Sequence, residues 1–594
     1  MLRCLALALG LVLALPAAVA ANGAPKTLRL VFAGAENGFD PAQVSDTVSA
    51  ALVGSLFEAP LTYEYLARPV RLKPAAAVAL PEVSDNHTRF VFTLRPGNHF
   101  PDHPVFKGVR RELVAADYVY SVKRYYDPAV RSPTLFHYEN AGLLGLLELR
   151  KQALADKKPF PYDVEVDGIR ALDRYRFEVR TSRPAPRLPY VFASPALAGA
   201  VAREVIEAHP GRSMEVPVGT GPFRLVSWKR ASRIVFERNP DYRMVYDEQP
   251  PADDVQGRAI ADRLRGRRIP MVDRVEFAVI DEAQPRWLAF LNGELDLVAV
   301  PDEFANVAAP NRQLAPNLAR QGMQLHEAVQ PSTLFVYFGM EHPVVGGYEP
   351  HKVALRRAVS LSYDVRREIN LVRKGRVPAA ASLLPPGVTG YDAGFRSDSS
   401  DYDPGRAKAL LDLYGYVDTD GDGWRERPDG QPLVLEFTTQ PDQLARQLQG
   451  LWKKALDGIG VRVDFKVATW QENIKASRAG KLMMWNSGWF AAVPDGGYFL
   501  DLMYGKNKGL SNHARFDLPA FNALYDRQRE LPDGPERDAL MLQAKRLAAA
   551  YLPYKPLVHS AGSWLTRAGV VGYRPHPYLR DAWRYVDVEA PAAP

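Results

Sequence analysis

The sequence contains almost no cysteine. Cys4 is the only one among 594 residues, and it lies at the start of an N-terminal apolar run. A mature chain without Met1–Ala20 would hold none, which excludes a disulfide framework and a nucleophilic cysteine. This composition suits an oxidising compartment in which the fold needs no disulfide.

Long apolar runs and common catalytic motifs are also missing. Beyond the N-terminus, no apolar segment approaches the ~18 residues that indicate a transmembrane helix. The patterns H-E-x-x-H, G-x-S-x-G and G-x-x-x-x-G-K-[ST] do not occur. We therefore expect a soluble protein that is not an enzyme.

The charge balance is only mildly basic. The formal net charge is +7, with 24% charged and 47% hydrophobic residues, which is ordinary for a globular protein. Spread over so long a chain, this bias predicts no nucleic-acid partner. The length is several times a usual domain of roughly 100–200 residues, so we expect two or three domains. Only the tail Ala590–Pro594 has the composition of a disordered segment.

The N-terminus has the three parts of a secretory signal peptide. Arg3 supplies the positive charge, Leu5–Leu15 the apolar run, and Ala18–Ala20 the small-residue cleavage site. The apolar run is too short to cross the ~30 Å core of a bilayer. We expect cleavage near Ala21, export and a periplasmic location.

A β-hairpin is predicted at Val218–Tyr242, which reads VGTGPFRLVSWKRASRIVFERNPDY. Glycines and a proline punctuate its start, and two apolar runs are separated by a polar turn. GTGPF, an apolar hairpin and ERNPDY together resemble the signature hairpin of the family 5 extracellular solute-binding proteins. These are the dipeptide/oligopeptide-type receptors of ABC importers.

Other segments resemble the same family in the same order. They are Asp40–Glu64, Leu72–Asp127 with its FTLRPG turn, Val272–Val300 with its GELD turn, and the predicted helix Lys352–Val372. The resemblance runs from about Thr27 to Tyr573, which is nearly the whole mature chain. It implies an α/β fold of two lobes, the class II periplasmic binding protein fold, with an extra subdomain inserted in the first lobe.

The same resemblance implies domain boundaries. We expect a signal peptide at 1–20, lobe I at 21–75, 206–315 and 561–594, an inserted subdomain at 76–205, and lobe II at 316–560. The chain is expected to cross between the lobes near Glu303–Leu325 and again at Tyr551–Trp564. The arginine-bearing stretch Tyr242–Pro270 is predicted to be a solvated surface insertion.

Residues on the segments that the resemblance directs to the interlobe cleft are candidate ligand contacts. Alternatively, a plain packing role accounts for each of them. The candidates are Glu36, Asn37, Phe39, Phe335, Tyr337, Trp485, Gly488, Trp489, Phe490, Asp495, Tyr498 and Arg515.

Charge in Trp485–Leu500 (WNSGWFAAVPDGGYFL) departs from the family pattern. In peptide-binding relatives an aspartate three residues after the tryptophan pairs with the peptide's α-amino group, and here that position is Ala492. A buried ammonium without a carboxylate costs several kcal/mol, so ligands with a free α-amino group are not expected. Arg515 favours an acidic ligand instead, unless Asp495 or Glu36 supplies the missing charge. His513 has no partner at metal or catalytic spacing.

An acidic loop matches calcium-loop spacing. Asp418, Asp420, Asp422 and Asp429 occupy positions one, three, five and twelve, with Gly423 at the turn. The apolar run that follows, Leu433–Phe437, predicts a strand where a calcium-binding helix pair would need a helix. Structural calcium and a metal-free acidic turn both remain open.

The function implied is capture of a peptide-like or other small organic ligand between two closing lobes, without turnover. The expected partner is the membrane permease of an ABC importer, and the chain is expected to be a monomer with no required cofactor. Two alternatives stay open, an exported hydrolase with acidic cleft residues and a periplasmic chaperone or sensor subunit.

Overall fold

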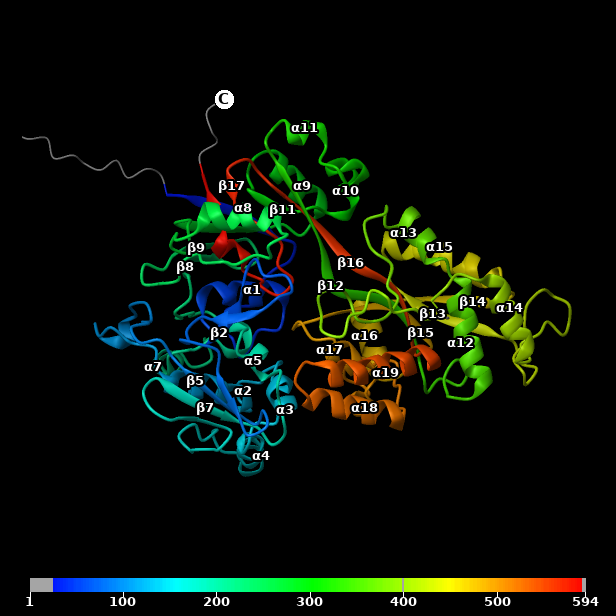
Figure 1. Cartoon of the computed structure of the whole chain (residues 1–594), viewed down its shortest axis with the longest axis horizontal. Coiled ribbons are helices and arrows are strands. Elements are labelled where there is room, and N and C mark those ends of the chain that lie inside the picture. Colours follow the sequence, from blue (N-terminus) through cyan, green and yellow to red (C-terminus); the bar gives the residue numbers. More distant parts are fainter. Residues whose placement is uncertain (1–24, 398–399, 590–594) are drawn as a thin grey trace, which may run out of the picture.

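The structure is a computed structural model that describes residues 25–397 and 400–589. The predicted signal peptide Met1–Ala20, Cys4 and the tail Ala590–Pro594 lie outside the described residues. Within the described part, no helix has both the length and the apolar character needed to cross a bilayer. Two lobes lie side by side and are connected by two long strands (Figure 1).

Lobe I is built on a sheet in the order β1 (Thr27–Phe32), β10 (Arg274–Val279), β9 (Arg233–Arg238) and β8 (Phe223–Lys229). β1 runs parallel to β10, and the remaining pairs are antiparallel. The predicted hairpin is therefore present as β8–β9. In β9 the consecutive residues Ile234, Val235 and Phe236 are all buried, so this strand is covered on both faces.

Helix α1 (Thr47–Leu56) packs on this sheet. Asp46 caps its N-terminus by accepting a hydrogen bond from the Ser49 amide at 2.7 Å. Leu52 and Leu56 share a buried cluster with Phe236 of the hairpin. Lobe I also contains short elements, namely β2 (Leu61–Tyr63), β3 (Leu72–Pro74), α9 (Ala283–Leu291), β11 (Leu297–Ala299), α10 (Ala305–Ala308), α11 (Pro316–Ala319), β17 (Val570–Val571) and β18 (Asp587–Val588).

The arginine-bearing stretch Tyr242–Pro270 is ordered, unlike the solvated loop predicted for it. Part of it forms helix α8 (Val255–Leu264), which Asp254 caps. Arg267 forms an ion pair with Asp587 of β18 at 2.7 Å. The arginines tie this segment to the C-terminal strand, so acidic partners far away in sequence account for their charge.

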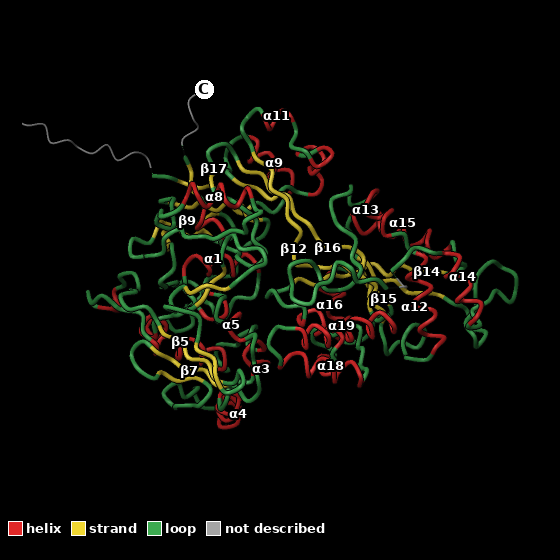
Figure 2. Tube along the Cα trace, viewed as in Figure 1, coloured by secondary structure: helices red, strands yellow, loops and turns green. Residues whose placement is uncertain are grey.

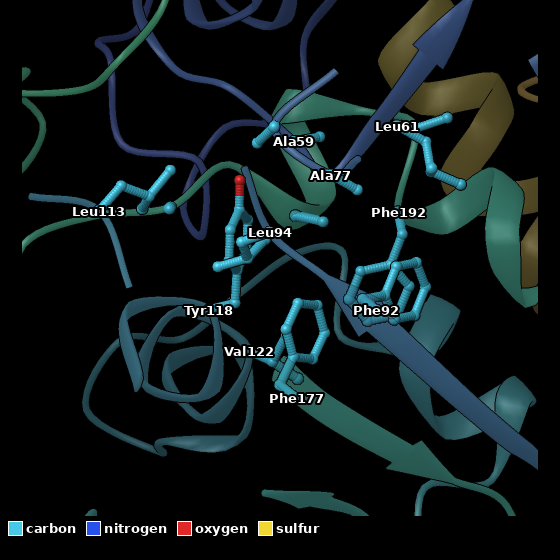
Figure 3. Close-up of a cluster of buried hydrophobic side chains, with 14 of the residues drawn as sticks. Ala59, Leu61, Ala77, Phe92, Leu94, Leu113, Tyr118, Val122, Phe177 and Phe192 are labelled. Carbon is cyan, nitrogen blue, oxygen red and sulfur yellow. The ribbon is translucent and has the colours of Figure 1, made fainter. Parts of the chain in front are cut away.

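The inserted subdomain has its own sheet and core. The sheet order is β4 (Glu82–Ser84), β5 (Arg89–Thr93), β7 (Arg176–Arg180) and β6 (Ile169–Ala171). Figure 3 shows the core, in which Phe92 stacks on Phe177 with ring centroids 4.9 Å apart and Tyr118 packs beside them. The helices of this subdomain are α2 (Ala115–Tyr126), α3 (Phe136–Ala141), α4 (Leu146–Asp156), α5 (Leu188–Val191), α6 (Pro195–Ala198) and α7 (Arg203–Ala208).

Lobe II surrounds the far end of a six-stranded sheet in the order β11, β16, β12, β15, β13, β14. The strands are β12 (Gln324–Phe338), β13 (Val434–Thr439), β14 (Arg462–Val467), β15 (Met484–Phe490) and β16 (Tyr554–Thr566). Helices cover it on both sides (Figure 2). They are α12 (Pro350–Ser362), α13 (Val365–Leu371), α14 (Pro404–Leu413), α15 (Gln443–Asp457), α16 (Trp470–Arg478), α17 (Gly497–Leu500), α18 (Pro519–Glu530) and α19 (Pro535–Tyr551).

The two crossings are the long antiparallel pair β12 and β16, which runs from lobe I into lobe II (Figure 1). Their register breaks between Val329 and Thr333, where residues 330–332 of β12 face Ser560 alone. Pro331 in this bulge has no amide hydrogen, so it cannot continue the ladder.

Candidate functional site

The lobes touch where the inserted subdomain meets lobe II. Arg187, directly before α5, donates hydrogen bonds to the carbonyls of Leu531 at 2.6 Å and Gln528 at 3.2 Å. These carbonyls belong to the C-terminal end of α18, which carries partial negative charge. Arg187 also lies 3.2 Å from the Oδ2 atom of Asp495. A cation of lobe I therefore joins a helix end and a carboxylate of lobe II.

Asp495 is buried and is held by two arginines. Its Oδ1 atom accepts hydrogen bonds from the Gly497 amide at 2.7 Å and from Arg537 at 2.8 Å. Burial alone would raise the pKa of Asp495, but the charges of Arg537 and Arg187 more than offset this and hold it below its usual value. The carboxylate stays ionised, and its charge is balanced within the protein.

An aromatic surface of lobe II lies beside this charge cluster. Trp489 and Phe490 end β15, and Tyr498 on α17 packs against Trp489 with ring centroids 5.7 Å apart. All three side chains are partly exposed. The Trp489 indole Nε1 is buried and has no hydrogen-bond partner among the described residues.

Lobe I contributes a second set of side chains from its C-terminal segment. Arg580 lies over the Phe490 ring at 5.5 Å from its centroid. Tyr578 packs against the buried cluster of lobe II on which Trp489 and Tyr498 also pack, and its ring centroid is 5.8 Å from that of Tyr63 in lobe I. The site is thus an interlobe contact with aromatic side chains and arginines on both sides.

The structure has one hollow beside this contact and a second one away from it. A groove of about 270 Å³ beside Arg187 is lined by both lobes, including Leu80, Tyr190 and Pro532. A larger hollow of about 760 Å³ on the inserted subdomain, lined by Glu139 and Glu148 among others, shares no residue with the interlobe contact. Because this hollow lies within one subdomain, closure of the lobes would not change its shape.

Comparison with known proteins identifies the family. Residues 71–511 match the family described as bacterial extracellular solute-binding proteins, family 5. The chain belongs to this family. It is therefore a solute-binding protein, as the sequence resemblance implied.

Curated relatives of this family 5 protein match over nearly its full length. Di/tripeptide-binding protein 2 of Pseudomonas aeruginosa (strain UCBPP-PA14) is 26% identical and covers 96% of each chain. Heme-binding protein A of Haemophilus influenzae is 26% identical over 87% of this chain and 84% of its own. Relatives with the same sequence identity to this chain are thus named for different ligands.

Solved structures confirm the two-lobed α/β fold of this family 5 protein. NikA from Brucella suis in complex with Fe(III)-EDTA matches with a TM-score of 0.72 at 17% identity, covering 95% of this chain and 100% of that chain. DppA from Helicobacter pylori in complex with the peptide STSA matches with a TM-score of 0.69 at 20% identity, covering 95% and 99%.

Four of the predicted ligand contacts of this family 5 protein come together at the interlobe contact, namely Trp489, Phe490, Asp495 and Tyr498. Gly488 precedes them on β15 and faces Leu334 of β12 across the sheet. A Cβ atom at Gly488 would lie 2.6 Å from the Leu334 side chain, so close packing of the two strands requires a glycine. Its role here is to let β15 approach β12.

Phe335, Tyr337 and Trp485 lie deeper, in the core of lobe II. Phe335 packs edge-on against Tyr554, and the Tyr337 hydroxyl is 2.6 Å from that of Ser477. The structure does not bring these three side chains to the interlobe contact. The reason is their position along β12 and β15, away from the strand ends that face lobe I.

Glu36, Asn37 and Phe39 serve the packing of lobe I. Glu36 accepts hydrogen bonds from the Trp228 indole at 2.6 Å and the Ala231 amide at 3.0 Å, both on the β8–β9 hairpin. Phe39 packs edge-on against Trp228. Asn37 donates to Asp46 at 2.9 Å. The hairpin covers this loop, so none of the three residues reaches the contact with lobe II.

Arg515 is also engaged elsewhere. It forms an ion pair with Glu341 at 3.3 Å within lobe II. Nearby His513 is buried, and burial lowers its pKa to about 4, so it stays neutral at ordinary pH. The arginines at the interlobe contact are Arg187 and Arg580, which sequence reasoning missed because neither lies near the Trp489 segment in the chain.

The acidic loop differs from the predicted ligand set. Carboxylate oxygens of Asp418, Asp420 and Glu426 lie within 4.8 Å of one another. Asp422 instead pairs with Arg462, and Asp429 with Arg427 at 3.2 Å. Two of the four predicted ligands therefore have cationic partners, which favours the metal-free acidic turn over structural calcium.

Proposed function

We propose that this protein captures its ligand at the contact between lobe I and lobe II and delivers it to the permease of an ABC importer. The observation that carries the proposal is Arg187. It joins the inserted subdomain to Asp495 and to the end of α18, so the two lobes are already linked at the site where the predicted aromatic contacts gather.

Closure follows from this geometry. A ligand that bridges Trp489 and Phe490 of lobe II to Tyr578 and Arg580 of lobe I has contacts in the closed form that the open form cannot provide. Its higher affinity for the closed form shifts the equilibrium towards closure. The β12 bulge at Pro331 lies between the lobes and allows this movement. The closed form is what the permease recognises.

We place the protein in the periplasm as a monomer that binds without turnover. The family and the relatives' names support a peptide-like or other small organic ligand. No residue of the interlobe contact is arranged as a nucleophile with an adjacent base among the described residues. The geometry supports recognition through arginines and aromatic rings.

The experiment is a thermal-shift screen of di- and tripeptides and N-acylated amino acids, followed by calorimetry and mass spectrometry of the compound. We expect reversible stabilisation of the protein, an unchanged compound, and a smaller radius of gyration in small-angle scattering on binding.

Arg187→Ala should weaken binding about tenfold or more, since a charged hydrogen-bonded link in the closed form is lost. Arg212→Ala, on the surface of lobe I, is the matched control. Conversion of the compound to a product would contradict the proposal.

A further inference from the structure

Carboxylates at the interlobe contact already have arginine partners, although the Asp495 Oδ2 atom accepts no hydrogen bond from a described residue. Asp495 is bound by Arg537 at 2.8 Å and Arg187 at 3.2 Å. Asp533 bonds to the same Arg537 at 2.6 Å and is half exposed to solvent. A ligand ammonium placed here would face the guanidinium groups of Arg187 and Arg537, which are already paired with these carboxylates.

The remaining acid at this place is Asp501. It accepts a hydrogen bond from Tyr525, and its peptide carbonyl accepts one from Asn507 at 3.2 Å. Burial raises the pKa of Asp501 to about 7, the charge of Asp495 adds to this shift, and Arg529 opposes it. Asp501 therefore competes poorly as a partner for a ligand ammonium.

Arg580, unlike the arginines around Asp495, has no carboxylate partner among the described residues. No carboxylate lies within ion-pair distance of it in the part of the chain that the structure describes, and its contact is the Phe490 ring. Partial burial of the guanidinium lowers the pKa of Arg580, and the nearby phenols of Tyr498 and Tyr63 act in the opposite direction. Arg580 is exposed at the junction of the lobes, so its planar guanidinium can receive an acid in bidentate fashion.

Unpartnered polar atoms lie in the same place. The Trp489 indole Nε1 and the Tyr578 hydroxyl are buried without a hydrogen-bond partner among the described residues. An indole N–H only donates and needs an oxygen acceptor. Buried donors of this kind cost free energy unless a bound group satisfies them. A ligand amide or acyl carbonyl would satisfy both.

We propose that the ligand carries a carboxylate, an amide or acyl carbonyl and an aromatic or apolar body, and has no free ammonium group. The carboxylate binds Arg580, the carbonyl accepts from Trp489 or Tyr578, and the apolar body packs on Phe490 and Tyr498. This inference rests on the proposed function, because it assigns a ligand class to the same interlobe site.

Four forms of one dipeptide test the class. L-Phe-L-Tyr is used with its amino group free or acetylated and its carboxyl group free or amidated, and calorimetry measures each. We expect the acetylated acid to bind most tightly. Amidation of the carboxyl group should weaken binding about tenfold or more, and so should removal of the acetyl group, which leaves a free ammonium.

Two variants test whether Arg580 causes the preference for the free carboxyl group. Arg580→Gln should remove the difference between the acetylated acid and the acetylated amide, and Arg212→Gln should leave it unchanged. The Arg580 side chain is exposed, so its replacement should not affect folding.

Preference for the free-amino dipeptide, or an acid-to-amide difference that survives in Arg580→Gln, would overturn the class and leave the proposed function standing. Binding by none of the four forms would also overturn the class. The proposed function fails separately, if no compound of the wider screen produces reversible closure.

Discussion

At the residue scale, the interlobe contact is governed by the balance between one buried carboxylate and the cations around it. Breaking a buried ion pair by removing one partner is costly because the other charge is left without compensation. Asp495 lies 3.2 Å from a lobe I arginine and 2.8 Å from a lobe II arginine. Its role is to hold these two cations in place.

Asp501 gives a test through pH. Burial raises its pKa from 3.8 to about 7. Between these values the folded protein keeps a proton that the unfolded chain releases, so the stability that Asp501 contributes falls as pH rises from about 4 to about 7. Asp501→Asn cannot ionise and keeps an acceptor for Tyr525.

We therefore expect Asp501→Asn to gain stability relative to the native protein between pH 5 and pH 8, on the order of 1–3 kcal/mol. Melting temperatures at the two pH values measure the change. Asp457→Asn, in an exposed pair on α15, is the control and should show no such gain. An equal pH dependence of Asp501→Asn and the native protein would contradict the burial of this charge.

The candidate site could be predicted from the sequence only on the lobe II side. Trp489, Phe490, Asp495 and Tyr498 lie within one segment of known family order, so a local pattern was enough to find them. Arg187 and Arg580 come from lobe I and meet this segment through tertiary folding alone. No periodicity or spacing connects them to it, and Arg515, the arginine predicted from the sequence, pairs with Glu341 within lobe II.

At the element scale, the crossings and the turns were predictable and their side-chain partners were not. The apolar run at Thr333–Met340 identified β12 as a buried central strand, which the sheet order confirms. The acidic loop was recognised by spacing as well. Its arginine partners, Arg462 and Arg427, follow from packing against β14 and from a second turn, which spacing does not encode.

The acidic turn is held by its own hydrogen bonds. Asp418 accepts from the amides of Gly421 at 2.7 Å and Gly423 at 2.9 Å, and Asp422 accepts from the Trp424 amide at 2.9 Å. We expect equal melting temperatures with calcium and with EDTA. Asp418→Ala should lower the melting temperature in both, because it removes two of these bonds.

A melting temperature that falls on chelation in the native protein, and does not fall in Asp420→Ala, would instead show that calcium is bound. Asp464→Ala, on the exposed side of β14, is the control for a general loss of surface charge.

At the scale of the whole molecule, the fold was predictable because many weak matches occur in one order along the chain. The signature hairpin is present as β8–β9 and the second crossing as β16, whereas the first crossing is β12, which lies mostly C-terminal to the stretch 303–325 predicted for it (Figure 1). The arrangement of the lobes explains why a solute can be recognised from both sides. We propose capture at the interlobe contact as the central feature of this binding protein.

A crystal structure of the protein with the compound that calorimetry shows to bind most tightly tests this feature. We predict density for the compound between Trp489 and Phe490 of lobe II and Tyr578 and Arg580 of lobe I. Density in the hollow of the inserted subdomain, or an interlobe contact left empty at saturating compound, would contradict capture between the lobes.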